Sequence, residues 1–115
     1  MPDFVYASTT LSDKEVVLKT IALLESFGMV DGIRENDGRM CILGALNKAQ
    51  GFDPFAHDNF DLVTRLHKEL SIGAPALKRE VDPAWELAEW SNDSVRVGRP
   101  QDVINALKTV AERLP

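Results

Sequence analysis

Hydrophobic residues recur at helical spacing through most of the chain, and capping signals bound the segments that they form. The first pattern follows Ser12, which together with Glu15 makes the S-x-x-E arrangement of a capping box. Gly28 suits the left-handed backbone that ends many helices. We therefore expect a helix from about residue 13 to residue 27. Its buried face is predicted to hold Val17, Ile21 and Leu24, widened by Val16, Leu23 and Phe27.

The next twenty residues are harder to assign from periodicity. Residues 29–39 contain two turn signals, Asp31-Gly32 and Asn36-Asp37-Gly38, and are predicted to be irregular. Residues 40–49 are apolar on all sides until their last turn, which favours a short buried helix, with a buried strand as the alternative. Gly44 lowers helix propensity. Its presence indicates that a neighbouring helix or loop approaches the backbone at this point.

Three more helices are predicted in the second half of the chain. The first is capped by Asp58 or Asn59 and ends over residues 71–75. The second begins at Asp82-Pro83 and is closed by Asn92 and Asp93, and the third begins at Pro100. The apolar positions of the first and third are Phe60, Val63, Leu66 and Leu70, then Val103, Leu107, Val110 and Leu114.

These elements predict an all-α, mainly helical fold in which residues 1–115 form one domain. We expect about five helices with a short, buried second helix, and residues 1–11 as an extended arm. The hydrophobic share of 44% and the charged share of 27% are typical of a globular protein. A chain of this size buries enough surface for one core.

Charge and cysteine content narrow the function classes. Thirteen Lys and Arg against 18 Asp and Glu give a net charge of -5, which disfavours a nucleic-acid partner because such binding needs clustered positive charge.

No window approaches the roughly 18 apolar residues of a membrane span. The first residues lack a signal-peptide pattern and Cys41 is the only cysteine. We expect a cytoplasmic protein without a membrane segment.

No residue set predicts catalysis or metal binding. Cys41 is the obvious nucleophile, and His57 and His67 are the only imidazole bases available to it. Because Cys41 lies in an apolar run, we interpret it as a packed core thiol. One Cys and two His cannot complete a structural zinc site, and no glycine-rich phosphate loop is present. We expect no catalytic residue, metal or cofactor, and lean against an enzyme without excluding one.

The tryptophans and the arginines near the C-terminus are the remaining candidates for binding. Trp85 and Trp90 diverge on a helix, so one is expected to fill the core while the other covers a loop or faces solvent. Arg96 and Arg99 can pair with Asp93 or bind an anion, and the acidic surroundings favour pairing.

Two short segments resemble a small family found in actinobacteria and their phages. Gly38-Arg39-Met40-Cys41-Ile42-Leu43-Gly44-Ala45-Leu46 resembles its Gly-Arg-x-Cys-x-x-Gly-Ala-Leu stretch, and Trp90-Ser91-Asn92-Asp93 resembles its Trp-Asn-Asp element with Ser91 inserted. Pro100 stands near the position where the family usually has a capping Thr. The resemblance implies a phage or actinobacterial source and transfers no catalytic residue. It also implies a shared surface made by Arg39, Trp90, Asn92, Asp93 and Arg99.

These observations lead to one hypothesis and one alternative. The hypothesis is a small helical protein-interaction module, encoded by a phage or prophage, that binds a host or phage protein in the host cytoplasm. The alternative is a small-molecule-binding protein or enzyme with a pocket near Arg39, Cys41 and the turn from Trp90 to Arg99. We also expect Arg39 to pair with Asp93, joining the second helix to the C-terminal part. The oligomeric state is left open.

Overall fold

The computed structural model describes residues 11–74, 77 and 82–115, and these form five α-helices and one two-stranded sheet. The mainly helical fold predicted from the sequence is thus confirmed. The extended arm predicted for residues 1–11 lies outside the described residues except for Leu11. The elements are α1 (Asp13–Phe27), β1 (Glu35–Asn36), β2 (Arg39–Met40), α2 (Ile42–Ala49), α3 (Phe60–Ser71), α4 (Pro83–Arg96) and α5 (Pro100–Arg113).

Most helices begin where their capping residues predicted. At α1 the Glu15 amide donates to Ser12 Oγ at 3.1 Å and the Ser12 amide donates to Glu15 Oε1 at 3.0 Å, which completes the capping box. Of the two candidate caps of α3, Asn59 is the one used. Asp82 caps α4 before Pro83, and α5 begins at Pro100. These starts are encoded locally, because each cap acts within its own first turn.

Two element boundaries differ from the prediction. Met40 belongs to β2, which pairs antiparallel with β1, so α2 begins only at Ile42. A two-residue strand has no period that a sequence pattern can reveal. Asn92 and Asp93 do not close α4, which continues to Arg96. Their polar side chains suggested a helix end, but Asn92 bonds to the loop before β1 and Asp93 bonds to Arg96 within α4, as described below.

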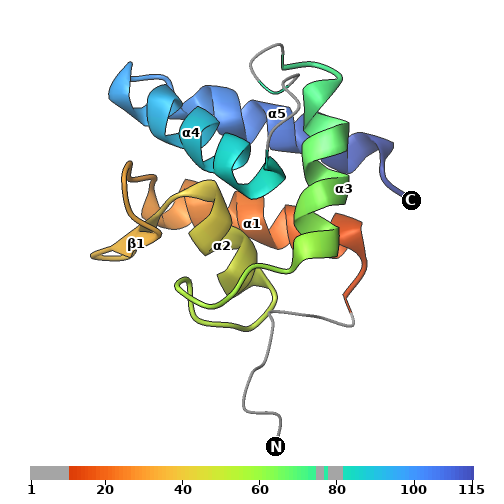
Figure 1. Ribbon diagram of the computed structural model, residues 1–115, viewed down its shortest axis with the longest axis horizontal. Coiled ribbons are helices and arrows are strands. Elements are labelled where there is room, and N and C mark those ends of the chain that lie inside the picture. The colour runs from red at the N-terminus through yellow and green to blue at the C-terminus, as the bar shows by residue number, and fades with distance from the viewer. Residues whose placement is uncertain (1–10, 75–76, 78–81) are drawn as a thin grey trace, which may run out of the picture.

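The helices form two layers with α3 across one end. Figure 1 shows α4 and α5 side by side above α1 and α2, with α3 running between the two layers at the right of the view. The hairpin of β1 and β2 leads from the end of α1 into α2. This arrangement places the N-terminus of α2 beneath α4, although about fifty residues separate them in the chain.

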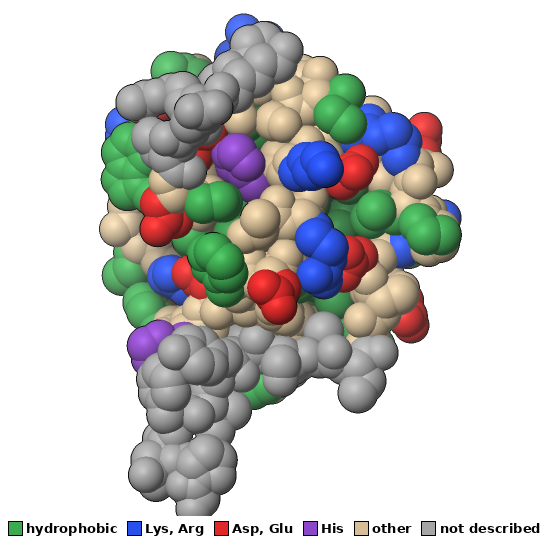
Figure 2. All heavy atoms as spheres, turned by 45° about the vertical axis from the view of Figure 1, so that its right-hand side comes forward, with side chains coloured by type: hydrophobic (Ala, Val, Ile, Leu, Met, Phe, Trp, Pro, Cys, Tyr) green, Lys and Arg blue, Asp and Glu red, His purple; other side chains and the backbone are tan. Residues whose placement is uncertain are grey.

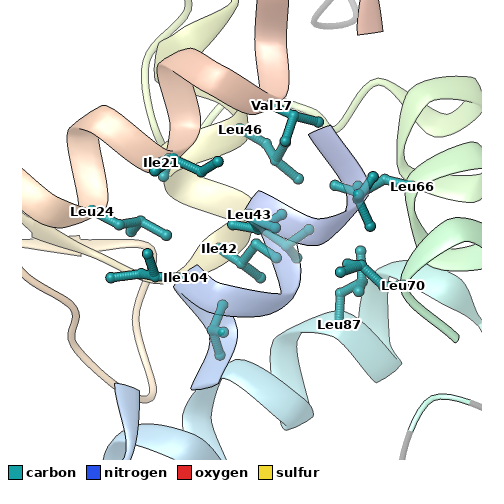
Figure 3. Close-up of a cluster of buried hydrophobic side chains, with 14 of the residues drawn as sticks. Val17, Ile21, Leu24, Ile42, Leu43, Leu46, Leu66, Leu70, Leu87 and Ile104 are labelled. Atoms are coloured by element: carbon teal, nitrogen blue, oxygen red, sulfur yellow. The ribbon is translucent and has the colours of Figure 1, made fainter. Parts of the chain in front are cut away.

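All five helices contribute side chains to one hydrophobic core. Figure 3 shows Leu46 of α2 and Leu66 of α3 among these residues, and both are at most 3% exposed. The core also holds Cys41, which is 4% exposed, so the interpretation of a packed thiol is confirmed. Residues of the predicted faces that lie in the core are Val16, Val17, Ile21, Leu24, Val63, Leu66, Leu70, Val103, Leu107 and Val110.

Two aromatic residues assigned to buried faces are instead exposed. Phe60 is 66% exposed, because it starts α3 beyond the core edge, and Leu62 is buried in its place. Phe27 is 52% exposed at the last turn of α1, where the helix has passed the core. For the tryptophans the expected division holds: Trp90 packs against the core, whereas Trp85 is 49% exposed.

Candidate functional site

The five residues predicted to share a surface occupy different environments. Trp90 is half-buried against the core, and Asn92 is half-buried on α4. Arg39, Asp93 and Arg99 are exposed. Asn92 contacts the loop before β1. Arg99 is at the start of α5, where it pairs with Asp102 at 3.2 Å.

The predicted ion pair between Arg39 and Asp93 was wrong. Asp93 Oδ1 instead accepts a hydrogen bond from Arg96 Nη1 at 2.7 Å, three residues further along α4. None of the ion pairs among the described residues joins Arg39 to Asp93. A partner on the adjacent turn of the same helix is nearer than one on another element. The Arg39 side chain lies over Gly28.

Two residues of the Trp-Ser-Asn-Asp segment, Ser91 and Asn92, bind the start of α2 and the loop before β1. Ser91 Oγ accepts a hydrogen bond from the Ile42 amide at 3.2 Å and so caps the N-terminus of α2, which has no side-chain cap of its own. Asn92 Oδ1 accepts from the Gly32 amide at 2.9 Å. We call Ser91 and Asn92 the loop clamp. The two segments that resemble the family are thus joined in space.

Gly44 lies at the closest approach between α2 and the loop before β1. A Cβ atom at this position would overlap the carbonyl oxygen of Arg34 and lie 2.9 Å from its carbonyl carbon. That carbonyl oxygen also accepts the Cys41 amide at 3.2 Å. The sequence-based expectation that a loop approaches the backbone at Gly44 is therefore confirmed.

Replacing Ser91 by Ala is expected to lower the free energy of unfolding by about 1–2 kcal/mol, because it removes the cap of a buried backbone amide. Ser91 is fully buried, whereas Ser26 on α1 is exposed. Ser26→Ala is the matched control, since it makes the same chemical change within a helix. Urea unfolding measures both. Equal stability of the two variants would contradict the capping role of Ser91.

A second polar network holds the loop between α2 and α3. Arg34 forms a two-bond ion pair with Asp58, with distances of 2.6 and 2.9 Å. Asn47, which is 1% exposed, donates to the carbonyl oxygens of Ala56 at 2.9 Å and Pro54 at 3.2 Å. Because the buried Asn47 amide and the partly buried ion pair satisfy their hydrogen bonds within this network, the network has a structural role.

A cleft of about 290 Å³ opens beside the loop clamp, near the pocket of the alternative hypothesis. Cys41, Ile33 and Trp85 contribute to its lining, and we call it the Cys41–Trp85 cleft. Its polar side chains already support the protein: Arg34 pairs with Asp58, and Asp82 caps α4. Binding pockets for small molecules usually present converging polar groups to the ligand. This cleft offers few.

Histidine and metal chemistry are limited in the described part of the chain. His67 is half-buried, and its Nε2 lies 2.7 Å from Oε1 of the buried Glu86. This contact joins α3 to α4, and no spacing rule could have found it, because the two residues lie on different helices. No three His, Cys, Asp or Glu side chains among the described residues are grouped to hold a metal ion.

A larger groove, of about 510 Å³, lies between α1 and the end of α2. The wall on α1 is formed by residues spaced three or four apart, which therefore share one face of the helix: Lys19, Ala22, Leu23, Ser26 and Phe27. Its other wall comprises residues 48–51, and Leu11 lies at its edge. The Lys48 ammonium lies 5.6 Å from the centre of the Phe27 ring. We call this feature the α1–α2 groove.

The side of the molecule that carries α3 has mixed charge. Figure 2 shows basic and acidic side chains next to one another there, with hydrophobic side chains between them. Arg65 on α3 donates to Asp13 on α1 at 2.7 and 2.9 Å, and Arg113 on α5 contacts Glu69 at 3.4 Å. The pairs join three helices. Every helix among the described residues is too short or too polar to cross a membrane.

The Asp13–Arg65 pair predicts a small loss of stability in acid. The hydrogen bonds from Arg65 lower the pKa of Asp13 below its ordinary value of 3.8. The pair therefore stabilises the fold above that value, and its contribution is lost as the pH falls through the lowered pKa. We expect Asp13→Asn to reduce the loss on acidification by about 0.5 kcal/mol, since both side chains are partly exposed and screened. Urea unfolding at neutral and acidic pH measures this loss of stability in the wild type and in Asp13→Asn. Identical losses in the two proteins would contradict the prediction.

Comparison with known proteins places the chain in a family. A family model described as a family of unknown function, DUF6197, matches residues 8–113. Neither a curated protein nor a solved structure matches the chain. The match covers both segments joined by the loop clamp and all five described helices. The chain therefore belongs to this family of unknown function, DUF6197.

Proposed function

We propose that this protein acts by binding another protein, and that the α1–α2 groove is its binding surface. The observation that supports this most directly is the exposure of Phe27, which is 52% exposed beside a groove with an apolar stripe. Aromatic side chains supply much of the binding energy in protein interfaces. The apolar residues of this wall, Ala22, Leu23 and Phe27, lie next to the face of α1 that is buried in the core.

The polar side chains of the Cys41–Trp85 cleft, compared with those of the α1–α2 groove, disfavour the small-molecule alternative. In the Cys41–Trp85 cleft, Arg34 and Asp82 are held by contacts within the protein. In the groove, Lys48 forms no ion pair among the described residues, and Lys19 has only the attraction of Glu15, one turn earlier on α1, without a close ion pair. The groove therefore has both the exposed apolar area and the available charge that a partner requires.

The proposal extends to the source and the partner. The resemblance of residues 38–46 and 90–93 to a family of actinobacteria and their phages supports a phage or prophage origin. The partner would then be a host or phage protein. Because Ser91 and Asn92 stabilise the fold, we assign them a structural role and place binding on α1.

The test is capture of a partner by the tagged protein from an actinobacterial lysate, with Phe27→Ala compared with Phe60→Ala. Both substitutions remove an exposed ring, but Phe60 starts α3 and does not line the groove. We expect Phe27→Ala to weaken capture at least about tenfold, the effect of losing one interface hot spot, and Phe60→Ala to leave it unchanged. Circular dichroism checks that both variants are folded. Equal capture by the two would contradict the proposal.

A further inference from the structure

We infer that the partner presents an acidic amphipathic helix to the α1–α2 groove. This inference rests on the proposed function and adds the chemistry of the partner. It follows from the shape of the groove, from the charges that line it and from the occupants that those charges disfavour.

The shape of the groove suits a helix. One wall is α1 from Lys19 to Phe27, and the other is the last turn of the neighbouring helix α2 with the two residues after it. At 1.5 Å per residue this wall is about 12 Å long, which matches two to three turns of a partner helix. A groove between helices receives the apolar face of an amphipathic helix, as in the helix-in-groove mode of peptide recognition. An added strand would need a sheet edge, and the groove has none.

The charges that line the groove are all positive. Lys19 lies near one end of the α1 wall, and Lys48 lies over Phe27 at the other end. No Asp or Glu is among the residues that line the groove, although the whole chain carries a net charge of -5. A partner with carboxylates about two helical turns apart would pair with both lysines while its apolar residues cover Leu23 and Phe27.

The same charges disfavour a second copy of this chain. A two-fold symmetric dimer through this face would place one groove against the other. The lining of each groove, which carries Lys19 and Lys48 and no carboxylate, would then face the same positively charged lining of the other copy. An acidic helix from a different protein removes this repulsion.

The probes are two synthetic helical peptides that carry the same leucine stripe. The first has Glu at positions i and i+7 flanking the stripe, and the second has Lys at those positions. Calorimetric titration of the protein (residues 1–115) is expected to show binding of the acidic peptide, and the binding should weaken at higher ionic strength. The double variant Lys19→Glu and Lys48→Glu should bind it about tenfold more weakly and should bind the basic peptide instead. Lys14→Glu, on α1 outside the groove, should change neither affinity.

Each alternative result has a defined meaning. Absence of acidic-peptide binding, equal binding of the two peptides, or insensitivity to the double variant overturns the inference. Concentration-dependent dimerisation that is lost in Phe27→Ala, or binding to phosphatidylglycerol vesicles that is lost in the double variant, also overturns it by assigning the groove to another occupant. The proposed function fails separately, if Phe27→Ala captures the lysate partner as well as Phe60→Ala does. If capture of the lysate partner depends on Phe27 but not on Lys19 and Lys48, the proposed function is supported and the inference of an acidic helix is wrong.

Discussion

Gly44→Ala should lower the free energy of unfolding by about 2–3 kcal/mol, although alanine is the better helix former. The added Cβ overlaps the Arg34 carbonyl oxygen, and the neighbouring carbonyl carbon is 2.9 Å away. The loop cannot retreat without loss, because that oxygen accepts the Cys41 amide at 3.2 Å. Overpacking of this kind costs about 1–3 kcal/mol or more, and the gain in helix propensity offsets at most about 1 kcal/mol.

The control for this prediction is Gly73→Ala. No atom lies within 4 Å of a Cβ added at Gly73, just after α3. We expect that variant to have unchanged or slightly higher stability, because alanine reduces the freedom of the unfolded chain. Urea unfolding of both variants measures the difference. A Gly44→Ala variant as stable as Gly73→Ala would show that the loop before β1 does not pack against α2 as described.

Asn47→Asp should lower the free energy of unfolding by at least as much, about 3 kcal/mol or more. The substitution keeps the shape of the side chain but replaces its donating amide by a carboxylate. Asn47 is 1% exposed and faces the carbonyl oxygens of Pro54 and Ala56, with Asp58 Oδ1 at 3.5 Å from its amide nitrogen. A buried charge that faces acceptors and another carboxylate is strongly unfavourable.

Asn105→Asp provides the matched control on an exposed position of α5, where it affects one surface hydrogen bond to Gln101. Chemical denaturation should show a change within about 0.5 kcal/mol for this variant. Limited proteolysis should cut the Asn47→Asp variant within residues 51–59, since its loop loses two anchoring bonds. Resistance of that loop to proteolysis together with native stability would contradict the role assigned to Asn47.

Local signals in the sequence predicted the starts of the helices better than their ends. The capping box at Ser12 and the pair Asp82-Pro83 act within one turn, so the sequence pattern contains all the information needed. The end of α4 was mispredicted because Asn92 bonds Gly32, sixty residues away in the chain. A polar residue that serves a distant backbone amide has the same local appearance as a helix cap. The hairpin was missed because its strands have two residues each.

The candidate site was only partly predictable for a related reason. The two segments that resemble the family do meet, through Ser91 and Ile42, but this contact stabilises the fold. Phe27 falls on the buried side of α1 by helical spacing, and only the position of the core shows that it projects beyond it. One signal for the groove was available in the sequence: residues 19, 22, 23, 26 and 27 repeat at helical spacing next to the buried face.

The measurement that tests the central claim most directly is hydrogen exchange of the protein (residues 1–115) with and without its captured partner. The account predicts added protection in α1 from Lys19 to Phe27 and around residues 48–51, with little change in residues 31–34 and in α4 from Trp85 to Asn92. Protection confined to those latter segments would contradict it, and would place binding at the Cys41–Trp85 cleft and the loop clamp instead.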